Sequence, residues 1–235
     1  MVLTELLIYT TLAGLAIPAG ALLARIERLQ PRWLETEFRH GVIAFGGGLL
    51  IAAVALVLVP EGVRHLSLGT VALSFGGGGL LFLGVDYWLA RRGDSAAQLV
   101  AMLLDFAPEA LALGAAFGGG SAVAPLLALL IMLQNLPESF NSYRELRAGG
   151  QPGRRVMRVM LLLVPLGPAC GLTGYYLLAD HPAITGIIML AAAGGILYLT
   201  FQDIAPQARL QRHWGPPLGA VAGFLAGLCG QQLLG

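Results

Sequence analysis

Two short polar motifs interrupt a long apolar stretch in the middle of the chain. The first runs from Asp105 to Glu109 (DFAPE) and the second from Gln134 to Glu138 (QNLPE). Each begins with a polar residue and ends four positions later with a glutamate that directly follows a proline. Positions i and i+4 share one face of an α-helix, so each motif presents its two polar side chains together. Such carboxylate and amide oxygens are suited to binding a divalent cation.

Pro108 and Pro137 add to this chemistry. A proline inside a helix has no N–H to donate, so it kinks the helix and frees a carbonyl one turn earlier. The freed carbonyl is a further oxygen for a ligand. The alternative interpretation is a polar hinge that hydrogen-bonds neighbouring helices. Two copies of the motif at matched depth favour the cation site.

A turn of small residues from Gly118 to Ser121 joins the two apolar runs. Asp105 lies 15 residues before Gly120, and Gln134 lies 14 residues after it. In an antiparallel helical hairpin, both motifs would lie about 20 Å from the turn, near the middle of a ~30 Å hydrocarbon layer. Ionisable groups are costly at that depth, so three carboxyl groups and an amide that meet there form a functional-site hypothesis.

The composition places these motifs in a membrane protein. Hydrophobic residues make up 57% of the 235 residues and charged residues only 11%, whereas about a quarter of the residues of a soluble domain are charged. We expect an all-α polytopic membrane protein with one transmembrane domain over residues 1–235 and eight transmembrane helices. The predicted spans of ~20 residues each run from Thr4 to Ala24, His40 to Pro60, Gly69 to Ala90, Ala97 to Phe117, Ala122 to Tyr143, Val156 to Ala179, Ala183 to Pro206 and Gly215 to Leu234.

The arginines predict the orientation. All 14 positive residues are arginines, and 13 of them lie in four alternate loops, with only Arg64 in the opposite loops. By the positive-inside rule, those four loops are cytoplasmic and both termini are outside. No cleavable signal is apparent, because Met1 to Gly20 lacks a positive n-region. We therefore expect a multi-pass protein of the cell membrane, which is the inner membrane if the source is a Gram-negative bacterium.

Other polar residues give weaker signals. Asp86, near the end of the third predicted span, is interpreted as interfacial, whereas Glu61 and Asp203 are either solvated helix ends or entrance and exit ligands. Cys170 and Cys229 fit neither a disulfide framework nor the spacing of a metal finger, and buried free thiols are the expectation.

The paired motifs resemble the two His-Asn-x-Pro-Glu-Gly motifs of the ZIP (Zrt-, Irt-like) family of metal transporters. In that family the motifs lie on the fourth and fifth of eight spans and both termini are outside, in agreement with the predicted topology. Further similarity to the family is found at the opening of its first span and at the ends of its second and seventh. The similar stretches in this chain are Thr11–Ala16, Leu58–Glu61 and Phe201–Pro206, so the resemblance covers nearly the whole chain.

The chain departs from the family pattern at several metal positions. Asp105 and Gln134 replace the motif histidines, Phe106 replaces the asparagine of the first motif, and Val164 stands where the sixth span usually carries a glutamate. The histidine-rich loop after the third span is missing.

The resemblance implies a metal site in this chain, with two adjacent positions in the family. The first position would use Asp105, Glu109, Gln134 and Glu138. The second would use Asn135 with the shared glutamates, but donors are lost there, so we expect a single site. Oxygen donors suit manganese, iron(II) or magnesium, and carboxylates bind zinc as well.

The function implied is secondary transport of a divalent cation, zinc, manganese or iron(II), which is the transported substrate. The expected partners are metal ions and membrane lipid, with no nucleic acid, and a homodimer is left open. An alternating-access or elevator-like movement is expected, with glycine-rich surfaces of spans two, three and seven as sliding faces. No His-Glu-x-x-His pair or Ser/His arrangement occurs in the spans, so an enzyme is not expected. The alternative is a ZIP-like relative that no longer transports metal and acts as a sensor, an assembly partner or a carrier of another solute.

The arginine distribution gives a first prediction. With Gln30→Cys and Gln232→Cys introduced singly, an impermeant thiol reagent should label the first only from the cytoplasmic side and the second only from outside. Labelling is measured in intact cells and in inverted vesicles, after Cys170 and Cys229 have been changed to serine. Labelling of both positions from one side would contradict the eight-span topology.

Overall fold

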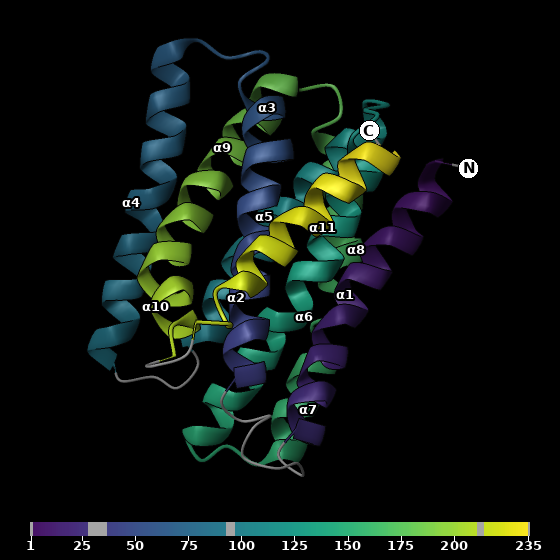
Figure 1. Ribbon diagram of the computed structural model, residues 1–235. Helices are drawn as coiled ribbons and strands as arrows, with labels where there is room; N and C mark the ends of the chain where they lie inside the picture. The colour runs from purple at the N-terminus through teal and green to yellow at the C-terminus, as the bar shows by residue number, and fades with distance from the viewer. Residues whose placement is uncertain (1, 28–36, 93–96, 211–213, 235) are drawn as a thin grey trace.

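The computed structural model describes residues 2–27, 37–92, 97–210 and 214–234, and every regular element in these ranges is helical (Figure 1). The all-α prediction is therefore confirmed for the described part of the chain. The elements are α1 (Val2–Glu27), α2 (Arg39–Ala53), η2 (Val54–Leu58), α3 (Val59–Gly62), α4 (Leu68–Arg92), α5 (Ala97–Gly118), α6 (Ala124–Ala148), α7 (Gly153–Leu162), α8 (Leu166–Leu177), α9 (Pro182–Leu199), η3 (Thr200–Ile204), α10 (Ala205–Ala208) and α11 (Leu218–Leu234).

Six helical segments in the described residues are long and apolar enough to cross a membrane. The two other predicted spans are α6 and α11. Of these, α6 has 25 residues but is polar along its second half, and α11 is apolar but has 17 residues. The helices support a polytopic membrane protein, and eight crossings stay a prediction. The six segments are Val2–Ile26, Arg39–Gly62, Leu68–Arg91, Gln98–Gly118, Gly153–Leu177 and Pro182–Ala208.

The predicted hairpin of α5 and α6 is present, and its turn follows from the glycines. At the end of α5, Ser121 N–H donates to Ala116 O at 2.8 Å and Gly120 N–H donates to Phe117 O at 3.2 Å. This pair of bonds is a Schellman motif, which requires a left-handed residue after the helix. Gly120 supplies it with a φ of 67°. The chain thus reverses within a few residues, and α6 begins at Ala124.

The helices pack in two groups. In the first group, α1 packs against α6 and α8, and α5 packs against α6 and α8. In the second, α2 packs against α11, and α9 packs against α3 and α4. The groups meet where α2 contacts α6 and where α5 contacts α9. Gly46 of α2 lies at the first of these contacts, because a Cβ added there would be 2.7 Å from Pro137 Cγ of α6.

The glycine clusters of α4 and α9 pack against one another. An added Cβ at Gly78 would lie 2.0 Å from Ala191 O, and one at Gly194 would lie 2.0 Å from Phe75 O. Small residues allow this close approach of membrane helices. These glycines pack two helices of the same group closely together, and the sliding role expected of spans three and seven stays a prediction.

Prolines account for two differences between the predicted spans and the helices. The sixth predicted span is broken between α7 and α8, because Pro165 has no N–H to continue the helix. The eighth begins at Leu218 and not at Gly215, because Pro216 and Pro217 precede it. The second and seventh spans each contain a π-helical segment, η2 and η3, a feature that is common at functional sites.

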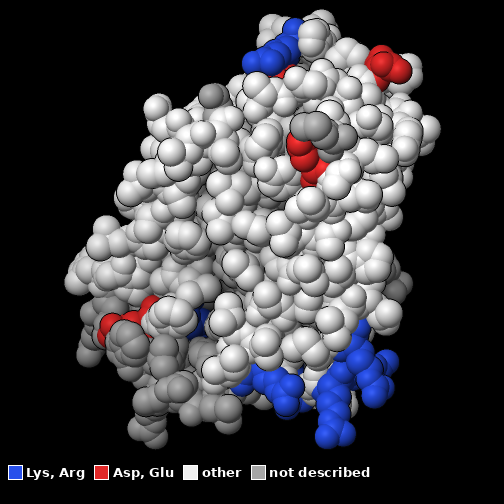
Figure 2. Space-filling view, turned by 90° about the vertical axis from the view of Figure 1, so that its right-hand side faces the viewer, with Lys and Arg blue, Asp and Glu red and all other residues white. Residues whose placement is uncertain are grey.

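Both marked chain ends lie at the same end of the helix bundle in Figure 1. At that end Arg64 forms an ion pair with Glu61 at 3.0 Å. On the face shown in Figure 2, the other basic side chains gather at the opposite end, where α7 and α10 lie in Figure 1. Because both chain ends lie at the same end of the bundle, the arrangement is consistent with an equal number of membrane crossings in each direction.

Candidate metal site between α5 and α6

Gln134 of α6 joins two carboxyl groups of α5. Its Nε2 donates to Asp105 Oδ2 at 3.3 Å and to Glu109 Oε2 at 2.5 Å. Asp105 is 2% exposed, and Glu109 and Gln134 are fully buried. The i,i+4 spacing places both acids on one face of α5, and the hairpin brings Gln134 to their depth. The structure thus brings together three of the predicted site residues.

Asn135 lies next to this cluster but is held by α1. Its Nδ2 donates to Ala13 O at 3.0 Å, and its backbone carbonyl oxygen accepts a 2.6 Å hydrogen bond from Ser139 Oγ. The side chain is fully buried. This contact joins residues 122 positions apart, so no local pattern in the sequence predicted it.

Glu138 and Asp105 line a small cavity of about 30 Å³, which is large enough for a water molecule. Leu50 of α2 and Asp203 of η3 line the same cavity from the second group of helices. The carboxyl groups on α5 and α6 therefore face outward from their own group, and the second group closes the cavity over them. Gln98 also lines it, and no pattern in the sequence singled out this residue.

Each of the five predicted site residues carries one unsatisfied oxygen. Six buried side-chain oxygens lack a hydrogen-bond partner in the described residues, and the sixth is Asn141 Oδ1. Buried polar atoms without a partner are rare in folded proteins, and each needs a reason. Here five of the six lie within the two polar motifs of the neighbouring helices α5 and α6, which is the pattern expected of oxygens that bind a ligand. The five are Asp105 Oδ1, Glu109 Oε1, Gln134 Oε1, Asn135 Oδ1 and Glu138 Oε2.

No basic side chain in the described residues forms an ion pair with Asp105, Glu109 or Glu138. Nor are any three His, Cys, Asp or Glu side chains in the described part of the chain grouped so that they could hold a metal ion. Instead, the Gln134 amide lies between two carboxyl groups, where its N–H bonds offset part of their mutual repulsion. Rotating that amide would exchange a donor for an acceptor oxygen.

A second small cavity continues from the first toward α4. Asp203 lines both cavities, and Asp86 lines the second, which has a volume of about 20 Å³. Asp86 Oδ2 accepts a 2.8 Å hydrogen bond from Tyr198 Oη of α9, so this residue is partnered within the protein. Asp203 is thus placed beside the candidate site as well as near the end of its helix. Glu61 is held away from it in the ion pair with Arg64.

No protein-family model matches the chain. The zinc transporter ZIPB of Bordetella bronchiseptica is 28% identical to it over 243 aligned residues, which cover 92% of this chain and 78% of that protein. Coverage of that extent includes both α5 and α6. The chain is therefore similar to a membrane transporter and not to an enzyme, which confirms the expectation on that point.

The bridging role of Gln134 gives a prediction for the metal-free protein. Gln134→Leu should lower its stability by roughly 1–3 kcal/mol, because two buried carboxyl groups lose their shared donor. The measurement is thermal unfolding in detergent with a chelator present. Ser142→Ala, which loses one bond from Oγ to Glu138 O on the same helix, is the control and should have a smaller effect. An unchanged unfolding temperature in Gln134→Leu would contradict the bridging role.

Proposed function

We propose that this chain is a secondary transporter of the ZIP type that carries a divalent metal cation through a site between α5 and α6. The similarity to a protein named as a zinc transporter supports metal transport. The observation that carries the proposal is the set of five unpartnered buried oxygens on Asp105, Glu109, Gln134, Asn135 and Glu138. Together these residues provide the carboxylate and amide donors that a divalent cation needs.

In the proposed cycle the Gln134 amide acts when no metal is bound. Its two N–H bonds to Asp105 and Glu109 reduce the repulsion between buried carboxylates, so the empty carrier keeps its helix packing. An incoming cation takes over this role, and the amide turns its oxygen toward the metal. Asp105, Glu109 and Gln134 therefore serve both the loaded and the empty state.

The proposed site is made of oxygen donors alone. Carboxylate and amide oxygens suit manganese and iron(II), while zinc also accepts carboxylates although it prefers imidazole and thiolate. Zinc, manganese and iron(II) are accordingly the proposed substrates. The same metal passes through the site in each cycle and is not a resident cofactor.

Transport requires movement between the two helix groups. The proposed movement carries α1, α5, α6, α7 and α8 past α2, α4, α9 and α11, with both termini outside the cell. The small cavity under Asp105 and Glu138 lies at this boundary, since Leu50 and Asp203 belong to the second group. The contact of Gly46 with Pro137 lies at the same boundary and lets α6 pass close to the α2 backbone.

A second candidate is a ZIP-like relative that no longer transports metal. One observation favours it: the acidic, histidine and cysteine side chains in the described ranges are not grouped as a ready metal site. Metal uptake by proteoliposomes that contain the purified protein separates the two. Uptake of zinc, manganese or iron(II) above that of empty liposomes supports the transporter, and its absence for all three supports the relative.

A substitution of Glu138 tests the proposed site. Glu138→Gln should abolish metal-dependent uptake or reduce it by roughly tenfold or more, because the cavity loses one of the two carboxylates that α5 and α6 contribute to it. The metal-free protein should be at least as stable as the wild type, because one buried charge is removed.

Thermal unfolding with and without added metal separates this role from a structural one. A metal that binds only the folded protein stabilises it by mass action. The wild type should therefore unfold at a higher temperature when metal is added. Glu138→Gln and Glu109→Gln should respond little. If all three proteins respond alike, these glutamates do not bind the metal. A structural role predicts instead that stability and uptake are lost together.

Metal preference provides a separate test at Asp105. Asp105→His should raise the relative affinity for zinc over manganese, because imidazole is the ligand that zinc prefers. Competition between the two ions is measured in the uptake assay. Asp86→His serves as the control outside the proposed site, and its metal ratio should equal that of the wild type. An unchanged ratio in Asp105→His would show that residue 105 does not contact the metal.

A further inference from the structure

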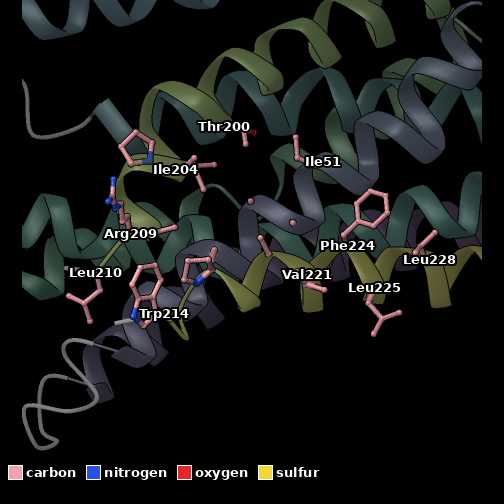
Figure 3. A pocket seen from close by; sticks show the side chains of 18 residues that line it. Ile51, Thr200, Ile204, Arg209, Leu210, Trp214, Val221, Phe224, Leu225 and Leu228 are labelled. Atoms are coloured by element: carbon pink, nitrogen blue, oxygen red, sulfur yellow. The ribbon is translucent and has the colours of Figure 1, made fainter. Parts of the chain in front are cut away.

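A large groove lies on the surface formed by α2, η3, α10 and α11 (Figure 3), and Ile204 separates it from the small cavity that Asp105 and Glu138 line. Its volume is about 1230 Å³. Gly47 and Ile51 of α2 form its floor with Ile204 of η3, and Val221, Phe224 and Leu228 of α11 line its length. The helices that form it are among the apolar segments of a membrane protein. The groove must therefore be filled by something that is apolar along most of its length.

The polar groups of the groove are gathered at one end. Among its described lining side chains, only Thr200, Arg209 and Trp214 carry a polar atom. Thr200 Oγ1 already donates to Ile196 O at 2.8 Å, which leaves two polar groups available. Figure 3 shows Arg209 and Trp214 at one end and Phe224, Leu225 and Leu228 toward the other. An occupant of matching chemistry has a polar head and an apolar tail.

Arg209 supplies the charge at the polar end. It directly follows α10, is exposed, and forms no ion pair with any acidic side chain in the described ranges. Trp214 is 92% exposed at the same end, and tryptophan is enriched at the level of lipid headgroups. A cationic group beside an interfacial tryptophan is complementary to the phosphate of an anionic lipid.

The length of the groove selects a lipid over a helix of a second copy. From Pro217 to Leu228 the lining residues rise by about 17 Å at 1.5 Å per residue, which is roughly half of a ~30 Å hydrocarbon layer. One leaflet of a bilayer has this depth, and so does one acyl chain within it. A transmembrane helix of a partner would need a groove along the full thickness.

We propose that this groove binds one anionic phospholipid, with its phosphate at Arg209 and an acyl chain along α11 between Val221 and Leu228. The site lies on the second group of helices, at the end where the arginines gather. It is distinct from the carboxylate site on α5 and α6, and it requires only that the chain is embedded in a bilayer. Its test is therefore independent of metal transport.

Fluorescence of Trp214 reports binding directly. In the full chain with Trp33 and Trp88 changed to phenylalanine, Trp214 is the single tryptophan. Phosphatidylglycerol or phosphatidylcholine with brominated acyl chains is titrated into the purified protein, because bromine quenches a nearby indole. We expect brominated phosphatidylglycerol to quench at a concentration on the order of fivefold lower than brominated phosphatidylcholine. This is the difference in affinity that one contact between an arginine and an anionic lipid provides.

Two charge variants make the result specific. Arg209→Gln should remove the difference between the two lipids. Arg154→Gln removes the same charge from α7, where the exposed side chain does not line the groove. This variant should keep the difference between the two lipids. Val221→Phe, which narrows the apolar part, should weaken quenching by phosphatidylglycerol while Arg209 is still present.

Four results would overturn the proposal. Equal quenching by the two lipids, or a difference that survives Arg209→Gln, would mean ordinary contact with bilayer lipid. An equal loss in Arg154→Gln and Arg209→Gln would mean a general charge effect. Absence of quenching together with disulfide formation between two copies of Val221→Cys would assign the groove to a second copy of the chain.

Discussion

Asp105 and Glu109 are buried in the apolar core and Glu138 is partly buried beside them, and no basic side chain in the described residues forms an ion pair with any of the three. An ionised carboxyl group in such a medium is strongly unfavourable unless hydrogen bonds or a counter-charge offset it. The Gln134 amide provides the only inter-helix side-chain hydrogen bonds to these groups among the described residues. The arrangement around it follows from this need: the tight hairpin places the amide at the depth of Asp105 and Glu109, and α1 closes the other side through Asn135.

The hairpin and the pairing across it were predictable because they depend on local features of the sequence. The left-handed turn requires a glycine where Gly120 stands, and the distances of Asp105 and Gln134 from it are nearly equal. The contacts of Asn135 with Ala13 and of Asp203 with the cavity were not predictable, because they join segments far apart in the chain. The direction in which a glycine packs also depends on the neighbouring helix. For this reason the packing of the α4 and α9 glycines against each other was not predictable from the sequence.

The candidate site is shared unequally between the two helix groups. All five residues with an unpartnered oxygen belong to α5 and α6, while the second group contributes the apolar Leu50 and the acidic Asp203 to the cavity wall. A ligand bound at these oxygens would keep its donors if one group moved relative to the other, because none of the five lies across the boundary. Only the wall that closes the cavity would change. This division separates the residues that hold a ligand from those that control access to it.

The compact turn between α5 and α6 also has a consequence for biosynthesis. In the proposed eight-span topology, either helix inserted alone would expose carboxyl or amide groups to lipid, which is unfavourable in the hydrocarbon layer. Gln134 and Asp105 are separated by 29 residues, so their hydrogen bond can form as soon as the second helix leaves the ribosome. The two helices are therefore expected to leave the translocon as a pair, with their polar faces turned toward each other before the remainder of the bundle has been synthesised.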